Sequence, residues 1–315
     1  MQRTELLRDI RETLVKTGFY VSDQSSLQEI GFDLVARKDD TLIIIKVLTN
    51  IDSLSENLAS EIKKLSFLLK ASPLLIGEKT GIGSLEDDVA YFRFGIQAIT
   101  LNTLKNHLLE GESINAYAAP GGLYVRLNEK KIRELRLAQG ISLGQFARYV
   151  KVSRRTAQMY EDGMNARADI AVRIEELLGN DIVVPIEILK ALESHQMNFS
   201  KPTKPILELK DFQNEILSLL TQVGYKITPL KKCPFEAVSS EKDRVLLTCV
   251  RKYDKFVKKA EVVSSISKIT ERRAVLFTDK EKSNTNIKGT PVINKKELKK
   301  IHDPEEIIEL IIERE

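Results

Sequence analysis

The alternation of apolar and polar residues between Asn128 and Gly163 predicts three short helices in succession. A first amphipathic helix stops at Gly140, and two shorter helices follow Ser142 and Ser153, whose hydroxyls can accept hydrogen bonds from free backbone amides. On the first helix the pattern places Ile132, Leu135 and Leu137 on the apolar face and leaves Lys130, Lys131, Arg133 and Arg136 for solvent or phosphate.

The second and third helices of this segment each have an inward and an outward face. Phe146, Ala147 and Val150 point inward from the second helix, Ala157 and Tyr160 from the third, and a fourth helix with Ile170, Ile174, Leu177 and Leu178 closes the core. The outward positions of the third helix are Arg154, Arg155, Gln158 and Met159. A short exposed helix that opens with two arginines fits the major groove of DNA.

A second pattern occurs twice, once on each side of the helical segment. LLRDIRETLVKTGFYV near the start and FQNEILSLLTQVGYKI from Phe212 both indicate an amphipathic helix that ends at a glycine (Gly18, Gly224) and leads into a strand. FDLVARKDDTLIIIKV from Phe32 then matches FEAVSSEKDRVLLTCV from Phe235, and each reads as two strands joined by a charged turn. A helix, a third strand, a short strand and another helix follow in both places, which predicts an α/β sandwich around a mixed sheet.

The predicted fold class is therefore multidomain α/β plus all-α, with a central helical bundle between two duplicated α/β domains. We expect the first copy at residues 1–110, a linker with a short strand at 111–125, the helical domain at 126–194, a proline- and lysine-rich linker at 195–207, and the second copy at 208–315.

Composition narrows the class of protein. The 315 residues include no signal peptide and no apolar run long enough to span a bilayer. Only Cys233 and Cys249 are present, which suits a reducing cytoplasm and argues against a cysteine-based zinc site. The three histidines are scattered, so we expect no metal cluster and no cofactor.

Positive charge is concentrated in the helical segment. Residues 126–178 hold eleven Lys and Arg against seven Asp and Glu, a surplus of four, and the whole chain, with 49 against 45, also has a surplus of four. The regions on either side of this segment therefore have no net charge when taken together. A concentration of basic residues in one segment is typical of nucleic-acid binding.

The helical segment resembles the helix-turn-helix of the Cro and lambda-repressor type, and the whole chain resembles an archaeal family of helix-turn-helix transcriptional regulators. The resemblance implies that Arg154 and Arg155 read base edges, with Gln158 and Met159 near the groove, and that Arg148 and Lys151 hold phosphates beside the capping residue Ser153. Two positions depart from the family pattern, because Leu143 replaces a usual glutamine and Lys151 replaces a usual turn glycine.

The flanking copies resemble the restriction-endonuclease-like, or PD-(D/E)xK, fold. Active members use two carboxylates and a lysine to hold Mg²⁺ and a nucleophilic water. The first copy keeps Asp33 and Lys46 but has Ile44 at the middle carboxylate, and the second has Glu236, Leu247 and Cys249. A migrated acid such as Glu56 or Glu61 is the one rescue that the sequence offers, and a degenerate, non-catalytic fold is favoured.

The sequence therefore predicts a cytoplasmic, dimeric regulator of transcription that binds double-stranded DNA. Two alternatives remain, a metal-dependent nuclease that the helix-turn-helix directs to its target and a non-enzymatic adaptor whose helices contact protein.

Overall fold

The computed structural model describes residues 2–23, 30–179, 182–193, 211–252, 256–257, 259–280 and 284–315. The chain divides into two compact units, one of Met1–Thr13, Leu48–Ser53 and Leu75–Ile188, the other of Leu14–Val47, Leu54–Leu74 and Leu189–Glu315. The interval 195–207, expected as a linker, lies outside the described residues.

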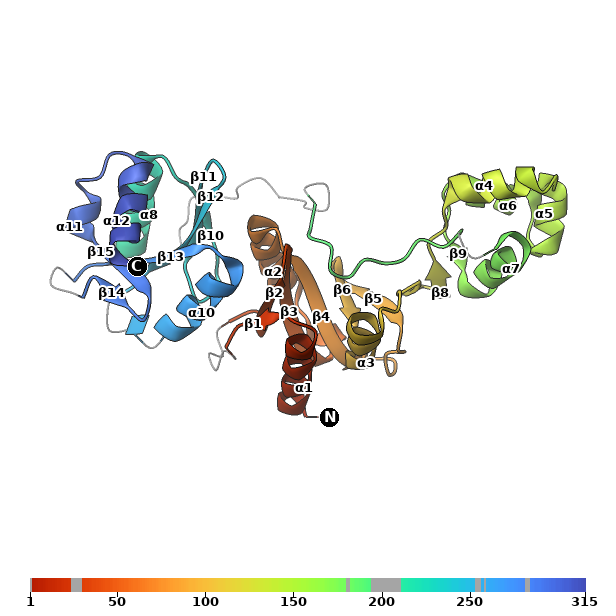
Figure 1. Ribbon diagram of the computed structural model, residues 1–315, viewed down its shortest axis with the longest axis horizontal. Helices are drawn as coiled ribbons and strands as arrows, with labels where there is room; N and C mark the ends of the chain where they lie inside the picture. Colours follow the sequence, from red (N-terminus) through yellow and green to blue (C-terminus); the bar gives the residue numbers. More distant parts are fainter. Residues whose placement is uncertain are drawn as a thin grey trace. The chain divides into compact units, whose positions relative to one another are not determined.

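The amino-terminal α/β region contains the predicted elements in the predicted order, with one further strand, Val89–Arg93, that the sequence pattern did not predict (Figure 1). Its elements are α1 (Arg3–Lys16), β1 (Tyr20–Val21), β2 (Leu34–Lys38), β3 (Thr41–Asn50), α2 (Glu56–Leu69), β4 (Ser72–Lys79), β5 (Val89–Arg93), β6 (Ile96–Ile99), α3 (Leu101–Lys105) and a π-helical turn, Asn106–Glu110. In β3 every side chain from Leu42 to Val47 is buried, which is typical of a strand covered on both faces of the sheet.

The interval 111–125, expected as a linker with one short strand, contains two strands. β7 (Ala116–Ala119) and β8 (Gly122–Val125) form an antiparallel hairpin; β7 also pairs in parallel with β5, and β8 pairs with β9 (Ala166–Arg167). The strand order of the whole sheet is β1-β2-β3-β4-β6-β5-β7-β8-β9. Small residues followed by Pro120 and two glycines look like a linker in sequence, but pairing with β5 makes them sheet.

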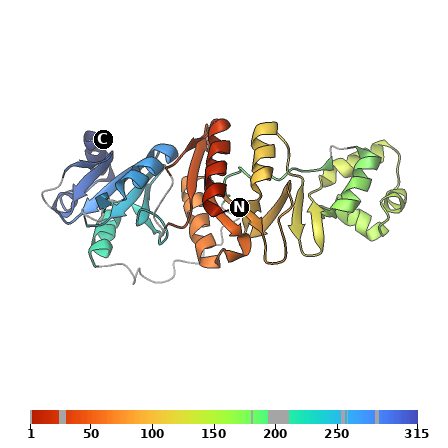
Figure 2. The ribbon, with the colours of Figure 1, turned by 90° about the horizontal axis from the view of Figure 1, so that it is seen from below.

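The helical region consists of α4 (Glu129–Ala138), α5 (Leu143–Tyr149), α6 (Arg154–Glu161) and α7 (Ala168–Leu178), which gather around one centre in both views (Figure 1, Figure 2). Their core contains Ile132, Phe146, Ala157, Tyr160 and Ile174, all at most 4% exposed. The inward positions expected for α5 and α6 are buried, and on α7 Ile174 and Leu178 are buried while Ile170 and Leu177 pack against the core from partly exposed positions. On α4, Leu135 only packs against the core and Leu137 is 58% exposed, so the expected stripe was wrong at Leu137.

The carboxy-terminal α/β region contains α8 (Asp211–Val223), β10 (Lys226–Pro229), β11 (Ala237–Glu241), β12 (Arg244–Val250), α10 (Ala260–Thr270), β13 (Arg273–Thr278), β14 (Asn286–Ile287), β15 (Thr290–Asn294), α11 (Lys295–Leu298) and α12 (Pro304–Arg314). Its strand order is β10-β11-β12-β13-β15-β14. Helices α8 and α12 share one core cluster with Val275 and Phe277 of β13. In Figure 1 helix α10 lies on the other side of β13 from them.

The first six strands of the larger sheet and all six of the smaller follow the same order. The hairpin registers also agree, since Leu34 faces Ile45 and Ala237 faces Thr248, each residue being displaced by 203 positions. The hairpin turns carry a left-handed residue at the same place, Asp39 with φ 50° and Lys242 with φ 49°.

Across the described part of the chain, no helix combines the length and hydropathy needed to cross a membrane.

Candidate DNA-binding surface and nuclease-like positions

Two capped helix starts position α5 and α6. Ser142 Oγ accepts from the amide of Gln145 at 3.3 Å while Gln145 Oε1 accepts from the amide of Ser142 at 2.8 Å, a reciprocal capping box. Ser153 Oγ accepts from the amide of Thr156 at 3.0 Å and caps α6. Both expected caps are present, and each fixes where its helix begins.

Lys151 lies in the turn between these helices with φ 59°, a left-handed conformation that glycine adopts more easily. The turn closes through the amide of Val152, which donates to Ala147 O at 3.0 Å. The lysine therefore accepts the unusual backbone that its position was expected to require, and its side chain is exposed.

The outward face of α6 carries the residues that the sequence indicated. Arg154, Arg155 and Gln158 are exposed and Met159 is 42% exposed. Gln158 Nε2 donates to Asp162 Oδ1 at 3.1 Å, whereas neither arginine has an ion pair within the described part of the chain. On the opposite face burial raises the pKa of Tyr160, consistent with its place in the core.

Arg136 was expected to be free for solvent or phosphate, and that expectation was wrong. Its side chain is 9% exposed and forms a two-point ion pair with Glu161, with Nε to Oε1 at 2.5 Å and Nη2 to Oε2 at 3.1 Å. Nη1 also donates to Ile141 O at 2.7 Å. Arg136 thereby ties α4 to the end of α6 and to the start of the turn before α5, so it orients the exposed helix from behind.

Tyr149 and Arg173 also belong to this region, although the sequence pattern did not single them out. Tyr149, beside the exposed Arg148, is 48% exposed at the end of α5. Arg173 Nη1 donates to Val150 O at 3.4 Å and stabilises the carboxyl end of the same helix. Leu143, the departure from the family pattern, packs against the hydrophobic core. The pattern of α5 could have indicated Tyr149, because this residue occupies an outward position whereas Phe146 and Val150 point inward.

The structure brings together the nuclease-like positions of the first α/β region. Lys46 Nζ lies 3.4 Å from Asp33 Oδ2, and these side chains are only 11% and 10% exposed. The same oxygen accepts from the amide of Val47 at 2.7 Å. Ile44, at the position of the middle carboxylate, is fully buried. The carboxylate of Asp33, which directly precedes β2, is therefore engaged by two residues of β3, Val47 and Lys46.

Glu236 has the same arrangement in the second region. Glu236 Oε2 accepts from the amide of Val250 at 2.8 Å, and Arg251 Nη2 lies 2.5 Å from Oε1. Burial raises the pKa of Glu236, and the neighbouring Arg251 opposes that shift. Leu247 and Cys249 are fully buried, and burial also raises the pKa of the Cys249 thiol.

Glu61, considered as a migrated acid, has other partners. Its Oε1 lies 2.7 Å from Lys64 Nζ, and its Oε2 accepts from the amide of Lys231 at 2.9 Å. No group of three or more His, Cys, Asp or Glu side chains suited to a metal ion occurs among the residues that the structure describes.

Two family models match this chain. One, described as a PD-(D/E)XK superfamily domain, matches residues 3–114, and the other, described as Helix-turn-helix, matches residues 132–184. Both resemblances seen in the sequence are confirmed for these ranges. No solved structure matches the chain.

Similar proteins extend over the whole chain. One from Methanosarcina barkeri is 36% identical over 320 residues, covering 100% of this chain and 98% of the relative, and is called "Putative HTH-type transcriptional regulatory protein". Proteins of the same description from Haloquadratum walsbyi and Halobacterium salinarum are 35% and 32% identical, with 100% of this chain and 98% of each relative covered.

Proposed function

This chain belongs to the family of archaeal HTH-type transcriptional regulatory proteins, and we propose on that basis that it is a sequence-specific DNA-binding regulator whose helix α6 reads bases in the major groove. The observation that carries the proposal is the exposure of Arg154 and Arg155 at the start of α6, a helix whose other face is locked into the core by Tyr160 and Glu161. The geometry of the guanidinium group suits the O6 and N7 acceptors of guanine.

The residues around α6 supply the contacts to the DNA backbone in this proposal. Arg148 and Lys151 are exposed just before α6, where they can neutralise phosphates, and Ser153 marks the positive end of the helix. The buried pair of Arg136 with Glu161 removes one charge of each sign from the surface, so the surplus of positive charge in this region remains outward.

We further propose that the regulator binds DNA as a homodimer. Two copies related by a two-fold axis would present two α6 helices to half-sites about one helical turn apart, roughly 34 Å. The operator is then expected to be near-palindromic, because the symmetry of the protein is reflected in the DNA.

Selection of sites from random duplex DNA, followed by gel-shift titration, tests the proposal. We expect an enriched near-palindrome, and we expect the Arg154→Ala/Arg155→Ala variant to bind it at least about tenfold more weakly, because each bidentate contact contributes roughly 1–3 kcal/mol. The Arg8→Ala/Lys16→Ala variant removes equal charge from α1 and serves as the control. Absence of an enriched sequence, or unchanged affinity of the α6 variant, would sink the proposal.

The flanking regions, residues 1–110 and 208–315, are in our proposal two copies of one restriction-endonuclease-like module around a helical domain at 126–194. The support is the shared strand order, the shared hairpin register and the matching acids Asp33 and Glu236, each bonded to an amide fourteen residues later. Both acids have structural partners, which favours a non-catalytic role.

The nuclease alternative has one observation in its favour, the PD-(D/E)XK match over residues 3–114. It predicts cleavage of duplex DNA with Mg²⁺ or Mn²⁺ that Asp33→Ala abolishes. We expect no cleavage above a metal-free control, because Asp33 is bonded to Val47 and Lys46 and because Ile44 replaces the second carboxylate.

A further inference from the structure

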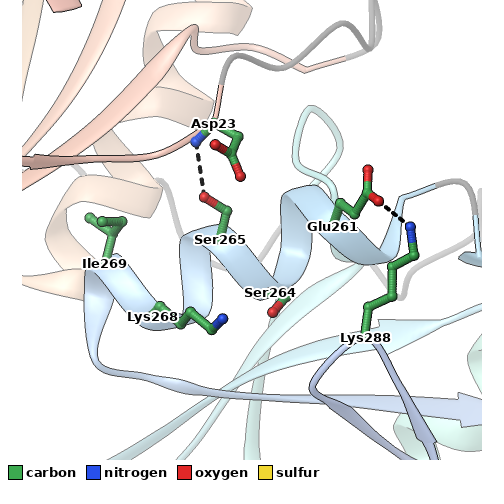
Figure 3. Close-up of a pocket in the computed structure, with 7 residues that line it drawn as sticks. All are labelled: Asp23, Glu261, Ser264, Ser265, Lys268, Ile269 and Lys288. Atoms are coloured by element: carbon green, nitrogen blue, oxygen red, sulfur yellow. Dashed lines mark hydrogen bonds and ion pairs between the residues drawn. The ribbon is translucent and has the colours of Figure 1, made fainter.

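Two segments of the first α/β copy, Leu14–Val47 and Leu54–Leu74, belong to the same compact unit as the carboxy-terminal copy. The amide of Asp23 donates to Ser265 Oγ at 2.9 Å, as Figure 3 shows. Asp23 is the second residue after β1, and Ser265 is the sixth residue of α10. On the same helix face, Glu261 pairs with Lys288 of its own copy beside a small cavity.

A second contact repeats the first with the copies exchanged. The amide of Lys231 donates to Glu61 Oε2 at 2.9 Å. Lys231 is the second residue after β10, and Glu61 is the sixth residue of α2. Each copy therefore donates the amide at one position and accepts with the side chain at another, and the positions are the same in both. Such reciprocity defines an isologous contact around a two-fold axis.

Gly31 and Lys232 form a further contact between the same segments. The amide of Gly31 donates to Lys232 O at 2.7 Å, and a Cβ added to Gly31 would lie 3.0 Å from Lys232 Cβ and 2.7 Å from Leu58 Cδ1. Gly31 thus permits a close approach of the two backbones. Arg37 and Glu271 add an ion pair at 2.8 Å between the copies.

From this reciprocity we infer that the two α/β copies pair with each other within one chain as a pseudo-dimer. The inference rests on the duplication proposed above, and it is independent of DNA reading by α6. Each copy is the partner that the other copy's surface fits, so the role of the flanking regions in this inference is to hold the two ends of the chain together.

The contact between the two copies lies near one of the nuclease-like positions. Cys233 directly follows Lys231 and Lys232, whose backbone groups contact Glu61 and Gly31 of the first copy, and burial raises the pKa of its thiol. The contact between the copies therefore lies a few residues before Glu236, which precedes β11. A surface covered by the other copy is closed to DNA and to a second chain, so a homodimer must use a different face.

Cross-linking of the full-length chain tests the pairing. The variants Asp23→Cys/Ser265→Cys and Glu61→Cys/Lys231→Cys are treated with a short bis-maleimide, and Cys233 and Cys249 are buried in the parent protein. Because proximity raises the effective concentration of the thiols, both pairs should form about tenfold more intramolecular cross-link than the Asp23→Cys/Glu309→Cys control on α12. Peptide masses identify the linked residues.

A yield no higher than the control for either pair, or cross-links that join two chains, would overturn the inference. Gly31→Ala should lower the yield several-fold, whereas Gly83→Ala, whose added Cβ meets nothing within 4 Å, should leave it unchanged. Gel shifts on the same samples separate the two proposals. Cross-linking without sequence-specific binding would contradict only the regulator, and binding without cross-linking would contradict only the pairing.

Discussion

Charged side chains have opposite surroundings on helix α6 and just before the strands β2 and β11 of the two α/β regions. Arg154 and Arg155 are exposed on a helix that is fixed from behind by the Arg136–Glu161 pair. Asp33 and Glu236 are nearly buried, and each is bonded to a strand amide and to a cation. The difference teaches that the kind of residue is a poorer guide to function than whether its polar atoms are already engaged.

The largest effect is expected from Glu161→Ala, which leaves the buried guanidinium of Arg136 without its carboxylate. Removing one partner of a buried ion pair costs about 3–5 kcal/mol, so α4 and α6 should lose protection and DNA binding should fail. Amide hydrogen exchange measured by mass spectrometry reports this helix by helix. Glu134→Ala, which changes an exposed acid on α4, is the control, and equal protection in the two variants would contradict the role of the pair.

Asp33→Ala tests the nearly buried acids in this comparison. It removes the acceptor for the amide of Val47 and the partner of Lys46, so the amino-terminal α/β region should lose about 2–3 kcal/mol of stability while affinity for the selected DNA stays the same. Urea denaturation and gel shifts measure the two quantities. Asp40→Ala changes an exposed acid in the same hairpin, and a variant at Asp33 that is as stable as this control would show that the carboxylate has no structural role.

A smaller effect is expected at the left-handed lysines. Lys151→Gly and Lys242→Gly should each raise stability by up to about 1 kcal/mol, because glycine adopts positive φ without a steric penalty. Only Lys151→Gly should weaken DNA binding, with a salt slope shallower by about one. Equal DNA affinity of both variants would remove Lys151 from the phosphate contacts.

The smallest effect concerns the dependence of stability on pH. Burial raises the pKa of Glu236, so the folded protein holds this proton to higher pH than the unfolded chain does. The contribution of the carboxyl to stability is therefore complete below its ordinary pKa and is lost as pH rises through the raised pKa. We expect urea midpoints, measured across pH for the parent protein and for Glu236→Gln, to show that the stability of the parent relative to the variant falls toward neutral pH. A constant difference would exclude this titration.

Local pattern made much of the structure predictable. Ser142 and Ser153 cap helices because their hydroxyls act within three residues, and the alignment of Phe32 with Phe235 anticipates the register of both hairpins. Arg136 was not predictable in this way, since its partner Glu161 lies 25 residues away. The hairpin of β7 and β8 likewise depends on pairing with β5, which composition does not reveal.

The most direct test of the account is fluorescence anisotropy with the selected duplex and a scrambled duplex of equal length. The parent protein should prefer the selected sequence, and Arg154→Ala/Arg155→Ala should bind both duplexes alike, with a remaining salt-dependent affinity for phosphates. If the variant discriminates between the duplexes as well as the parent does, α6 is not the element that reads DNA.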